Sequence, residues 1–423
     1  MTNKKARLGI ICLTVFIDLI GFGIVIPTLP FYAQHFGAKE MTIGLLLGTY
    51  SLMQFIFAPI LGKISDRVGR RPVLLVSLTA TVVGFAIMGF ARTLPWLFIG
   101  RIVPGISGGN ISTAQAYMAD ITTPEERSRV MGLIGAAFGL GFTLGPGIGG
   151  LLSHYSIAAP YLFAAGLALV NLVLAYVRLP ESLSPEHRVS AEERAPISEV
   201  FQHGWHLPTL MGGYFFAIAG FAIMTTIFAL FTQARFGFGA AQNGGVFFLL
   251  GFIGILVQGG LLRRLLKKGS EKKLAVIGVA LLIVGMALLP EVGGLAALLI
   301  VSTVIGIGSS LVSPTLLGLA SRSAERTWQG RVTGLMQSSG SLARCVGPFI
   351  AGKLLSMDAE RLKHISSYEM TLKVKEHSLH LDVNQLGQTY PYGSTPCWVA
   401  AGILCIALVL TMTLPAKPIT AAA

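Results

Sequence analysis

Residues 62–72 read GKISDRVGRRP and join two apolar runs of membrane-spanning length. Gly62 permits a close approach of two helices, and Gly69 permits a tight turn. The four cations of the stretch hold it on the cytoplasmic side, where Lys and Arg are preferentially retained. Loop charge alone does not account for Asp66, which lies between the two glycines. The stretch therefore predicts a specific turn between two membrane helices.

The composition fits a chain that is dissolved in a bilayer. Of 423 residues, 53% are hydrophobic and 12% are charged, and the mean hydropathy is +0.71. The formal net charge of +13 would suggest a nucleic-acid partner only on a soluble domain, and no soluble stretch is long enough to form one. The four cysteines show neither a disulfide framework nor a metal-ligand spacing, so no metal is expected.

Hydropathy predicts an all-α membrane protein with twelve transmembrane helices. The predicted spans are residues 8–30, 42–62, 73–91, 95–118, 130–152, 158–179, 208–231, 243–262, 273–290, 295–320, 331–354 and 395–414. The connections on the side of the two termini hold most of the 32 Lys and Arg residues. Both termini are therefore predicted in the cytoplasm of a multi-pass inner-membrane protein, and the first apolar run is interpreted as a retained helix.

The two halves of the chain repeat one another. With an offset of 202 positions, RVMGL at 129–133 falls on RVTGL at 331–335, and GPGIGGLL at 145–152 falls on GPFIAGKL at 347–354. These segments belong to the fifth and eleventh predicted spans. An offset of six helices preserves orientation, so two parallel six-helix bundles are expected, related by an axis along the membrane normal.

The repeat divides the chain into two predicted domains. The first bundle covers residues 1–180, and the second covers residues 208–423. Residues 181–207, which are rich in Pro, Ser and charge, form the predicted cytoplasmic linker. The second bundle contains a long extracytoplasmic connection at 356–395.

Four motifs carry a resemblance to a known family. The stretch 62–72 is similar in full to the loop signature of the major facilitator superfamily, Gly-x-x-x-Asp-Arg-x-Gly-Arg-Arg. RxxxGxxxG from Arg101 and GxxxGxGxxxGP from Gly135 resemble two further signatures, the second typical of proton-driven exporters. DxxGxGxxxPxLP from Asp18 narrows the resemblance to the twelve-helix drug–proton antiporters, near the tetracycline exporters. The resemblance implies the major facilitator fold and a transporter rather than an enzyme.

Two nucleotide-binding patterns are set aside. The GxGxxG at 145–150 lies within a predicted span and does not follow a strand, as a dinucleotide site requires. Gly62-Lys63 is not a Walker A motif, because Ile64 stands where Ser or Thr would bind magnesium. No cofactor is expected, and an ion gradient is the expected energy source.

Ionisable residues at midplane depth are the candidates for substrate and proton binding. Asp18 lies about ten residues, or roughly 15 Å, from the cytoplasmic end of its span and is the predicted proton-coupling carboxylate. Related exporters place a helix 1 Asp beside a helix 4 Arg, which the resemblance assigns to Arg101. A purely structural pair is the alternative. Arg344 is expected to face the central cavity, where it binds an anionic substrate group or pairs with Asp18, and a structural role is the alternative. The predicted substrate-cavity residues are Asp18, Arg101, Asn110, Gln115 and Arg344.

The resemblance also implies a cytoplasmic gate. In similar transporters the loop Asp meets the positive N-terminal end of helix 11, and the loop Arg bonds a helix 4 Asp, which holds the outward-facing state shut on the inside. The predicted gate residues are Gly62, Asp66, Arg67, Gly69, Arg70 and Asp120. The residues expected to bend the fifth span are Gly141, Gly145, Pro146 and Gly149.

The predicted function is alternating-access export of a small, amphiphilic or drug-like solute in exchange for protons, by a monomer in a lipid bilayer. One alternative is a facilitator or proton symporter for a sugar-like or organic solute, and another is a non-transporting sensor or scaffold of the same fold. Tetracycline exporters have acidic residues in helices 3 and 9 and a His in helix 8. In this sequence the third and eighth predicted spans lack these residues, and Glu291 lies at the very end of the ninth. Tetracycline is therefore not the expected substrate. The HxxH from His377 is interpreted as ordinary polar sequence.

Overall fold

The computed structural model describes residues 4–108, 110–122, 124–183, 206–268, 270–323, 329–375 and 392–415, and these residues form helices and connections without a strand. In chain order the helices are α1 (Lys4–His35), α2 (Glu40–Val68), α3 (Arg70–Gly89), α4 (Leu94–Ile106), α5 (Asn110–Asp120), α6 (Pro124–Leu152), α7 (Ala159–Arg178), α9 (Leu207–Phe236), α10 (Ala240–Leu256), η3 (Val257–Leu261), α11 (Leu262–Lys268), α12 (Glu271–Leu288), η4 (Leu289–Glu291), α13 (Leu295–Arg322), α14 (Gln329–Lys375) and α16 (Ser394–Thr413).

Each predicted span overlaps almost completely with one helix or with consecutive helices, although several of these helices extend beyond the span. In the described chain, nine helices are long and apolar enough to cross a membrane, and Leu94–Ile106 and the Gly139–Leu152 part of α6 are shorter apolar segments. The predicted span 95–118 is divided between α4 and α5, and the predicted span 331–354 is the first half of α14. The helical fold class is therefore found, and the count of twelve membrane crossings stays a prediction.

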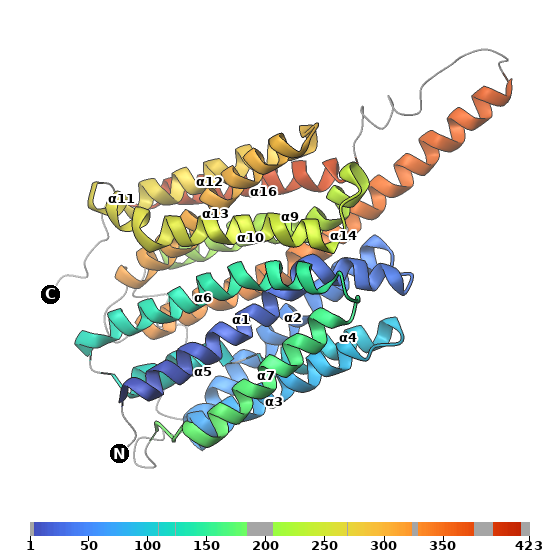
Figure 1. Ribbon diagram of the computed structural model, residues 1–423. Helices are drawn as coiled ribbons and strands as arrows, with labels where there is room; N and C mark the ends of the chain where they lie inside the picture. Colours follow the sequence, from blue (N-terminus) through green and yellow to red (C-terminus); the bar gives the residue numbers. More distant parts are fainter. Residues whose placement is uncertain are drawn as a thin grey trace.

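The helices form two groups that lie side by side. Figure 1 shows α1 to α7, coloured blue to green, below α9 to α16, coloured yellow to red. In the first group α1 packs on α6 and α3 packs on α7, while in the second α9 packs on α16 and α12 packs on α13. The groups meet where α2 contacts α14 and where α6 contacts α10. The second and eleventh predicted spans, α2 and the first part of α14, are the repeat equivalents of the eighth and fifth, α10 and α6. The two contacts are therefore equivalent in the predicted repeat.

Glycine pairs make these two contacts very close. A Cβ atom at Gly352 of α14 would lie 3.1 Å from the Cα of Gly44 on α2, and a Cβ atom at Gly150 of α6 would lie 3.1 Å from the Cα of Gly244 on α10. Gly150 and Gly352 are equivalent in the 202-residue repeat. The two groups thus touch through their backbones at the end opposite the 62–72 loop, which closes that end in this conformation.

Gly244→Ala is expected to shift the protein away from this closed arrangement. A Cβ atom at Gly244 would lie 2.8 Å from the Cα of Gly150, and backbone cannot move aside as a flexible side chain can. Overpacking of this kind costs about 1–3 kcal/mol, which corresponds to a population change of roughly five- to a hundredfold. Spin labels at Lys39 and Glu360, placed on a background without native cysteines, measure the separation of the two groups at this end.

Gly245→Ala is the matched control for this variant. It adds the same methyl group to the neighbouring position of α10, where a Cβ atom would meet nothing within 4 Å. Its distance distribution should match that of the parent protein. If Gly244→Ala also leaves the distribution unchanged, the glycine contact does not hold this end closed.

The predicted extracytoplasmic connection begins as helix, because α14 continues to Lys375 and projects from the bundle (Figure 1). Asp358, which is 6% exposed, accepts hydrogen bonds from the backbone N–H groups of Gly393 at 3.1 Å and Thr395 at 3.2 Å. The Thr395 hydroxyl also donates to Asp358. Asp358 therefore joins the two ends of the connection at the start of α16. His377 lies outside the described residues.

Candidate functional site

A seam of small residues holds α6 against α1 beside Asp18. A Cβ atom at Gly141 would lie 2.7 Å from the carbonyl oxygen of Phe16, and one at Gly145 would lie 2.9 Å from the Cα of Gly23. Small residues four apart lie on one face of a helix and let two backbones meet. Gly141 and Gly145 therefore position the segment of α1 that carries the half-buried Asp18. The predicted bending of the fifth span stays a prediction, and α6 runs as one helix through Pro146.

The Arg101 side chain lies over an aromatic ring. Its guanidinium carbon is 4.7 Å from the centre of the Tyr50 ring, and the residue is 5% exposed. Gly105, one turn further along α4, allows this approach, because a Cβ atom there would lie 3.0 Å from the carbonyl oxygen of Tyr50. Within the described chain Arg101 forms no ion pair, so the Tyr50 ring takes the place that the resemblance gave to the Asp18 carboxylate. A direct Asp18–Arg101 pair stays a prediction for other conformations.

Tyr50 also lies near ionisable residues of both helix groups. Its phenol lies within electrostatic range of Asp18 on α1, Arg101 on α4 and Arg344 on α14. Arg344 is half-buried, and its guanidinium donates to the Ser341 hydroxyl at 3.1 Å. We call Asp18, Tyr50, Arg101 and Arg344 the Tyr50 cluster. It combines one acid and two cations from both halves of the repeat, and the predicted spans put Asp18 near the midplane, where transporter sites lie.

Aromatic side chains extend the Tyr50 cluster toward α6. The ring centre of Phe22 is 6.0 Å from that of Tyr50 and 6.4 Å from that of Phe142. Phe142 is the repeat equivalent of Arg344. Of the other predicted cavity residues, Gln115 is half-buried on α5, and the side chain of Asn110 lies outside the described part of the chain. Their contribution to the cavity stays a prediction.

Three of the predicted gate residues come together at the end of the first helix group that carries the 62–72 loop. Arg70 forms ion pairs with Asp66 at 2.6 Å and with Asp120 at 3.1 Å. The three side chains are 11% to 21% exposed, so water screens these pairs only in part. We call Asp66, Arg70 and Asp120 the latch. The contact of Asp66 with the start of the eleventh predicted span, in α14, stays a prediction.

Two other gate residues have a different role from the one predicted. The expectation that Gly62 permits a close helix approach is wrong for this structure, because a Cβ atom there would meet nothing within 4 Å in the described chain. A glycine allows a close contact but does not require one. Arg67 is exposed and projects from the end of α2. Its part in the gate stays a prediction.

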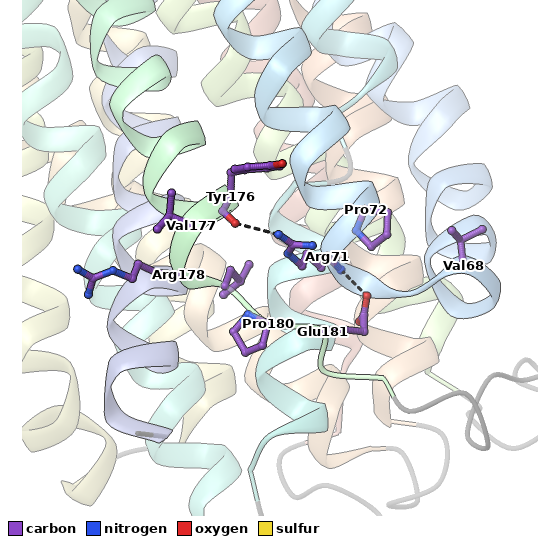
Figure 2. A pocket seen from close by; sticks show the side chains of 9 residues that line it. Val68, Arg71, Pro72, Tyr176, Val177, Arg178, Pro180 and Glu181 are labelled. Atoms are coloured by element: carbon purple, nitrogen blue, oxygen red, sulfur yellow. Dashed lines mark hydrogen bonds between the residues drawn. The ribbon is translucent and has the colours of Figure 1, made fainter. Parts of the chain in front are cut away.

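Gly69 makes room for a carboxylate that the sequence analysis did not single out. Its φ of +114° is a conformation that side chains rarely adopt, and a Cβ atom there would collide with Glu181. Glu181 accepts hydrogen bonds from the backbone N–H groups of Arg70 at 2.8 Å and Arg71 at 3.1 Å. Figure 2 shows the bond to Arg71. A carboxylate at a helix N-terminus satisfies unpaired N–H groups and the helix dipole. Glu181 therefore fixes the first turn of α3, which carries Arg70.

The start of the predicted linker docks on the latch as well. The Ser182 hydroxyl donates to the Asp120 carboxylate at 3.0 Å, and the Tyr117 hydroxyl donates to the Pro180 carbonyl at 2.7 Å. These contacts join the end of α7 to α5, and Glu181 between them joins it to the 62–72 loop. Movement of the linker start and movement of the latch are thus mechanically coupled.

The described residues contain no group of three or more His, Cys, Asp or Glu side chains that could hold a metal ion. The features present are a charged cluster between two repeated helix groups and an ionic latch at one end. The family model described as the Major Facilitator Superfamily matches residues 11–348. The chain belongs to the major facilitator superfamily.

Several members of the major facilitator superfamily are similar over most of their length. Tetracycline resistance protein, class H, of Pasteurella multocida is 32% identical over 82% of this chain and 88% of that protein. Multidrug resistance protein 2 of Bacillus subtilis (strain 168) is 28% identical over 84% of this chain and 90% of that protein. The crystal structure of the human organic anion transporter MFSD10 (TETRAN) shares the fold, with a TM-score of 0.70, 22% identity and coverage of 97% of this chain and 100% of that chain.

Membership of the major facilitator superfamily confirms the predicted fold class and the prediction of a transporter rather than an enzyme. The protein is a multi-pass membrane transporter of small molecules, similar to drug exporters of the superfamily. The family match does not test the roles of Asp18, Arg101 and the latch, which stay predictions.

Proposed function

We propose that the protein exports a small, amphiphilic or drug-like solute in exchange for protons, as a monomer that alternates between inward- and outward-facing states. The Tyr50 cluster carries this proposal, because Asp18 and two cations, drawn from both helix groups, all lie within electrostatic range of the Tyr50 phenol. A carboxylate inside the membrane costs free energy, so such residues usually have a function, and proton exchange is a common one. The names of the tetracycline and multidrug resistance relatives support a drug-like solute.

Alternating access requires two ends that close in turn. The Gly44–Gly352 and Gly150–Gly244 contacts close one end in this conformation. The latch lies at the opposite end, on a loop that a rocking of the two helix groups would move. Closure at either end around a central cluster is the movement that exchanges substrate for protons.

Transport by purified protein in proteoliposomes tests the proposal. A panel of amphiphilic and drug-like solutes is offered with an imposed pH gradient, and uphill accumulation that collapses on addition of a protonophore is expected for at least one solute. Equilibration without accumulation would indicate the facilitator instead. Absence of flux for every solute that binds in a thermal-shift screen would favour the sensor or scaffold.

We also propose that both termini and the latch lie in the cytoplasm. A cysteine at Lys63 should then react with an impermeant maleimide only in inside-out vesicles, and one at Arg361 only in right-side-out cells. Both side chains are exposed, so access to reagent depends on the side of the membrane alone. The background lacks Cys12, Cys345, Cys397 and Cys405. Labelling of both positions from the same side would overturn the twelve-helix topology.

A further inference from the structure

A groove of about 380 Å³ opens beside the latch, away from the Tyr50 cluster (Figure 2). It lies between the junction of α2 with α3 and the end of α7. Its lining consists of Val68, Arg71, Pro72 and residues 176–181. Neither the proposed exchange of solute and protons nor the latch itself uses this groove.

The groove continues into the apolar outer surface of the helices. Val177 is 67% exposed, and Val173 and Val170, four and seven residues earlier on the same face of α7, are 53% and 55% exposed. On the neighbouring α3, Val76 and Val83 are 63% and 43% exposed and also lie seven residues apart. Since α3 packs against α7, these side chains form an apolar column that leads from the groove toward the membrane interior.

Cations line the groove where the apolar column ends. The Arg71 guanidinium donates to the Tyr176 carbonyl at 2.8 Å and lies 5.6 Å from the centre of the Tyr176 ring. A guanidinium has five N–H donors, and in the described chain the Arg71 side chain uses one of its two terminal nitrogens while Nε has no acceptor. Arg178 is exposed and also lines the groove, with its side chain turned away from Arg71 (Figure 2).

The carboxylate in the groove does not cancel this positive charge. Glu181 accepts from the backbone N–H groups of Arg70, Arg71 and Ser182, so it serves the N-terminus of α3. Arg71 and Arg178 form no ion pair with another described residue. The groove therefore combines two cations, an exposed aromatic side chain in Tyr176 and an apolar column, which are the features expected of a lipid headgroup site at a membrane interface.

We propose that this groove binds the phosphate-bearing headgroup of an anionic phospholipid, with an acyl chain along the apolar column of α3 and α7. The phosphate would accept from the unused donors of Arg71, and Arg178, whose side chain is turned away from Arg71, would add positive charge to the groove. Arg71 follows the latch residue Arg70, and Glu181 holds both backbone N–H groups, so a lipid here stiffens the loop that carries the latch. A soluble anion would gain nothing from the apolar column, which favours a lipid as the occupant.

Native mass spectrometry of the purified full chain measures this binding without any transport assay. The protein is equilibrated with phosphatidylglycerol, with phosphatidylcholine of the same acyl chains, or with glycerol phosphate. Phosphatidylglycerol should be retained about tenfold more than phosphatidylcholine. Arg178→Gln, which removes a cation with no internal partner in the described chain, should reduce phosphatidylglycerol retention about fivefold, and Arg71→Gln should reduce it at least as much.

Lys63→Gln is the matched control, because Lys63 is an exposed cation of the same loop that does not line the groove. It should retain phosphatidylglycerol like the parent protein, and all variants are checked for an unchanged melting temperature. Equal retention of the two lipids, or an equal loss in Lys63→Gln and Arg178→Gln, would overturn the site. Glycerol phosphate binding as tightly as phosphatidylglycerol would also overturn the lipid, since the acyl column would then contribute nothing.

Discussion

Asp18→Asn is expected to abolish export driven by a pH gradient while substrate binding persists. An antiporter needs a group whose protonation differs between its two states, and Asp18 is the acid of the Tyr50 cluster. The amide has nearly the same shape and cannot release a proton. It therefore imitates the protonated carboxyl, and a change from Asp to Asn removes the coupling without removing the cavity.

The expected effect is large because coupled transport requires each protonation state of the carrier to favour one conformation strongly over the other. A hundredfold preference between two conformations requires about 2.7 kcal/mol of differential free energy, and Asp18 is the proposed source of that difference. We expect gradient-driven flux to fall at least tenfold, to the level of liposomes without protein. Exchange of labelled for unlabelled substrate should continue, because it needs the cavity and the conformational change but no net proton movement.

Asp18→Glu is the matched control, since it keeps a titratable group one methylene further from α1. Partial recovery of gradient-driven flux is expected from this variant. Flux and binding are measured on the same proteoliposome preparation, so that loss of protein does not imitate loss of coupling. Uphill transport by Asp18→Asn would show that another group carries the proton or that Asp18 has only a structural role.

The sequence predicted those parts of the site that depend on pattern within one segment. Spans follow from hydropathy, and the 62–72 motif located Asp66 and Arg70 at the connection between two spans. The ion pair between them was not predicted, and it joins the end of α2 to the start of α3. The small residues of α6 were recognised by their spacing, although their observed role is packing against α1. Resemblance supplied the one distant partner that was found, Asp120.

The sequence could not predict contacts that depend on how distant helices dock. Glu181 binds a backbone N–H group that lies 111 positions earlier, and no local pattern distinguishes it from the other acids of the linker. In the sequence Tyr50 is one of many aromatic residues in the spans, and no pattern indicates that its ring packs against the Arg101 guanidinium. Gly62 shows the opposite error, because a small residue in a motif was given a contact that the docked helices do not make.

Arg70→Gln is expected to lower transport about five- to thirtyfold while the protein remains folded and inserted. Arg70 forms the ion pairs with both Asp66 and Asp120, so its neutralisation leaves two carboxylates facing each other without the cation that joined them. These partly buried pairs hold α2, α3 and α5 together within the first helix group, and we propose that they favour the state in which this end closes by about 1–2 kcal/mol, which corresponds to that change in population. Initial rates in proteoliposomes and the melting temperature are measured together.

A graded series separates the latch from general loss of charge. Arg70→Lys should recover part of the rate, because an ammonium group can approach one carboxylate but lacks the planar fork that reaches two. Glu181→Gln should lower the rate only a few-fold, because its amide oxygen still accepts one N–H bond from the first turn of α3. Lys63→Gln removes a cation from the same loop and should transport like the parent protein. A parental rate in Arg70→Gln, or an equal loss in Lys63→Gln, would remove the latch from the transport cycle.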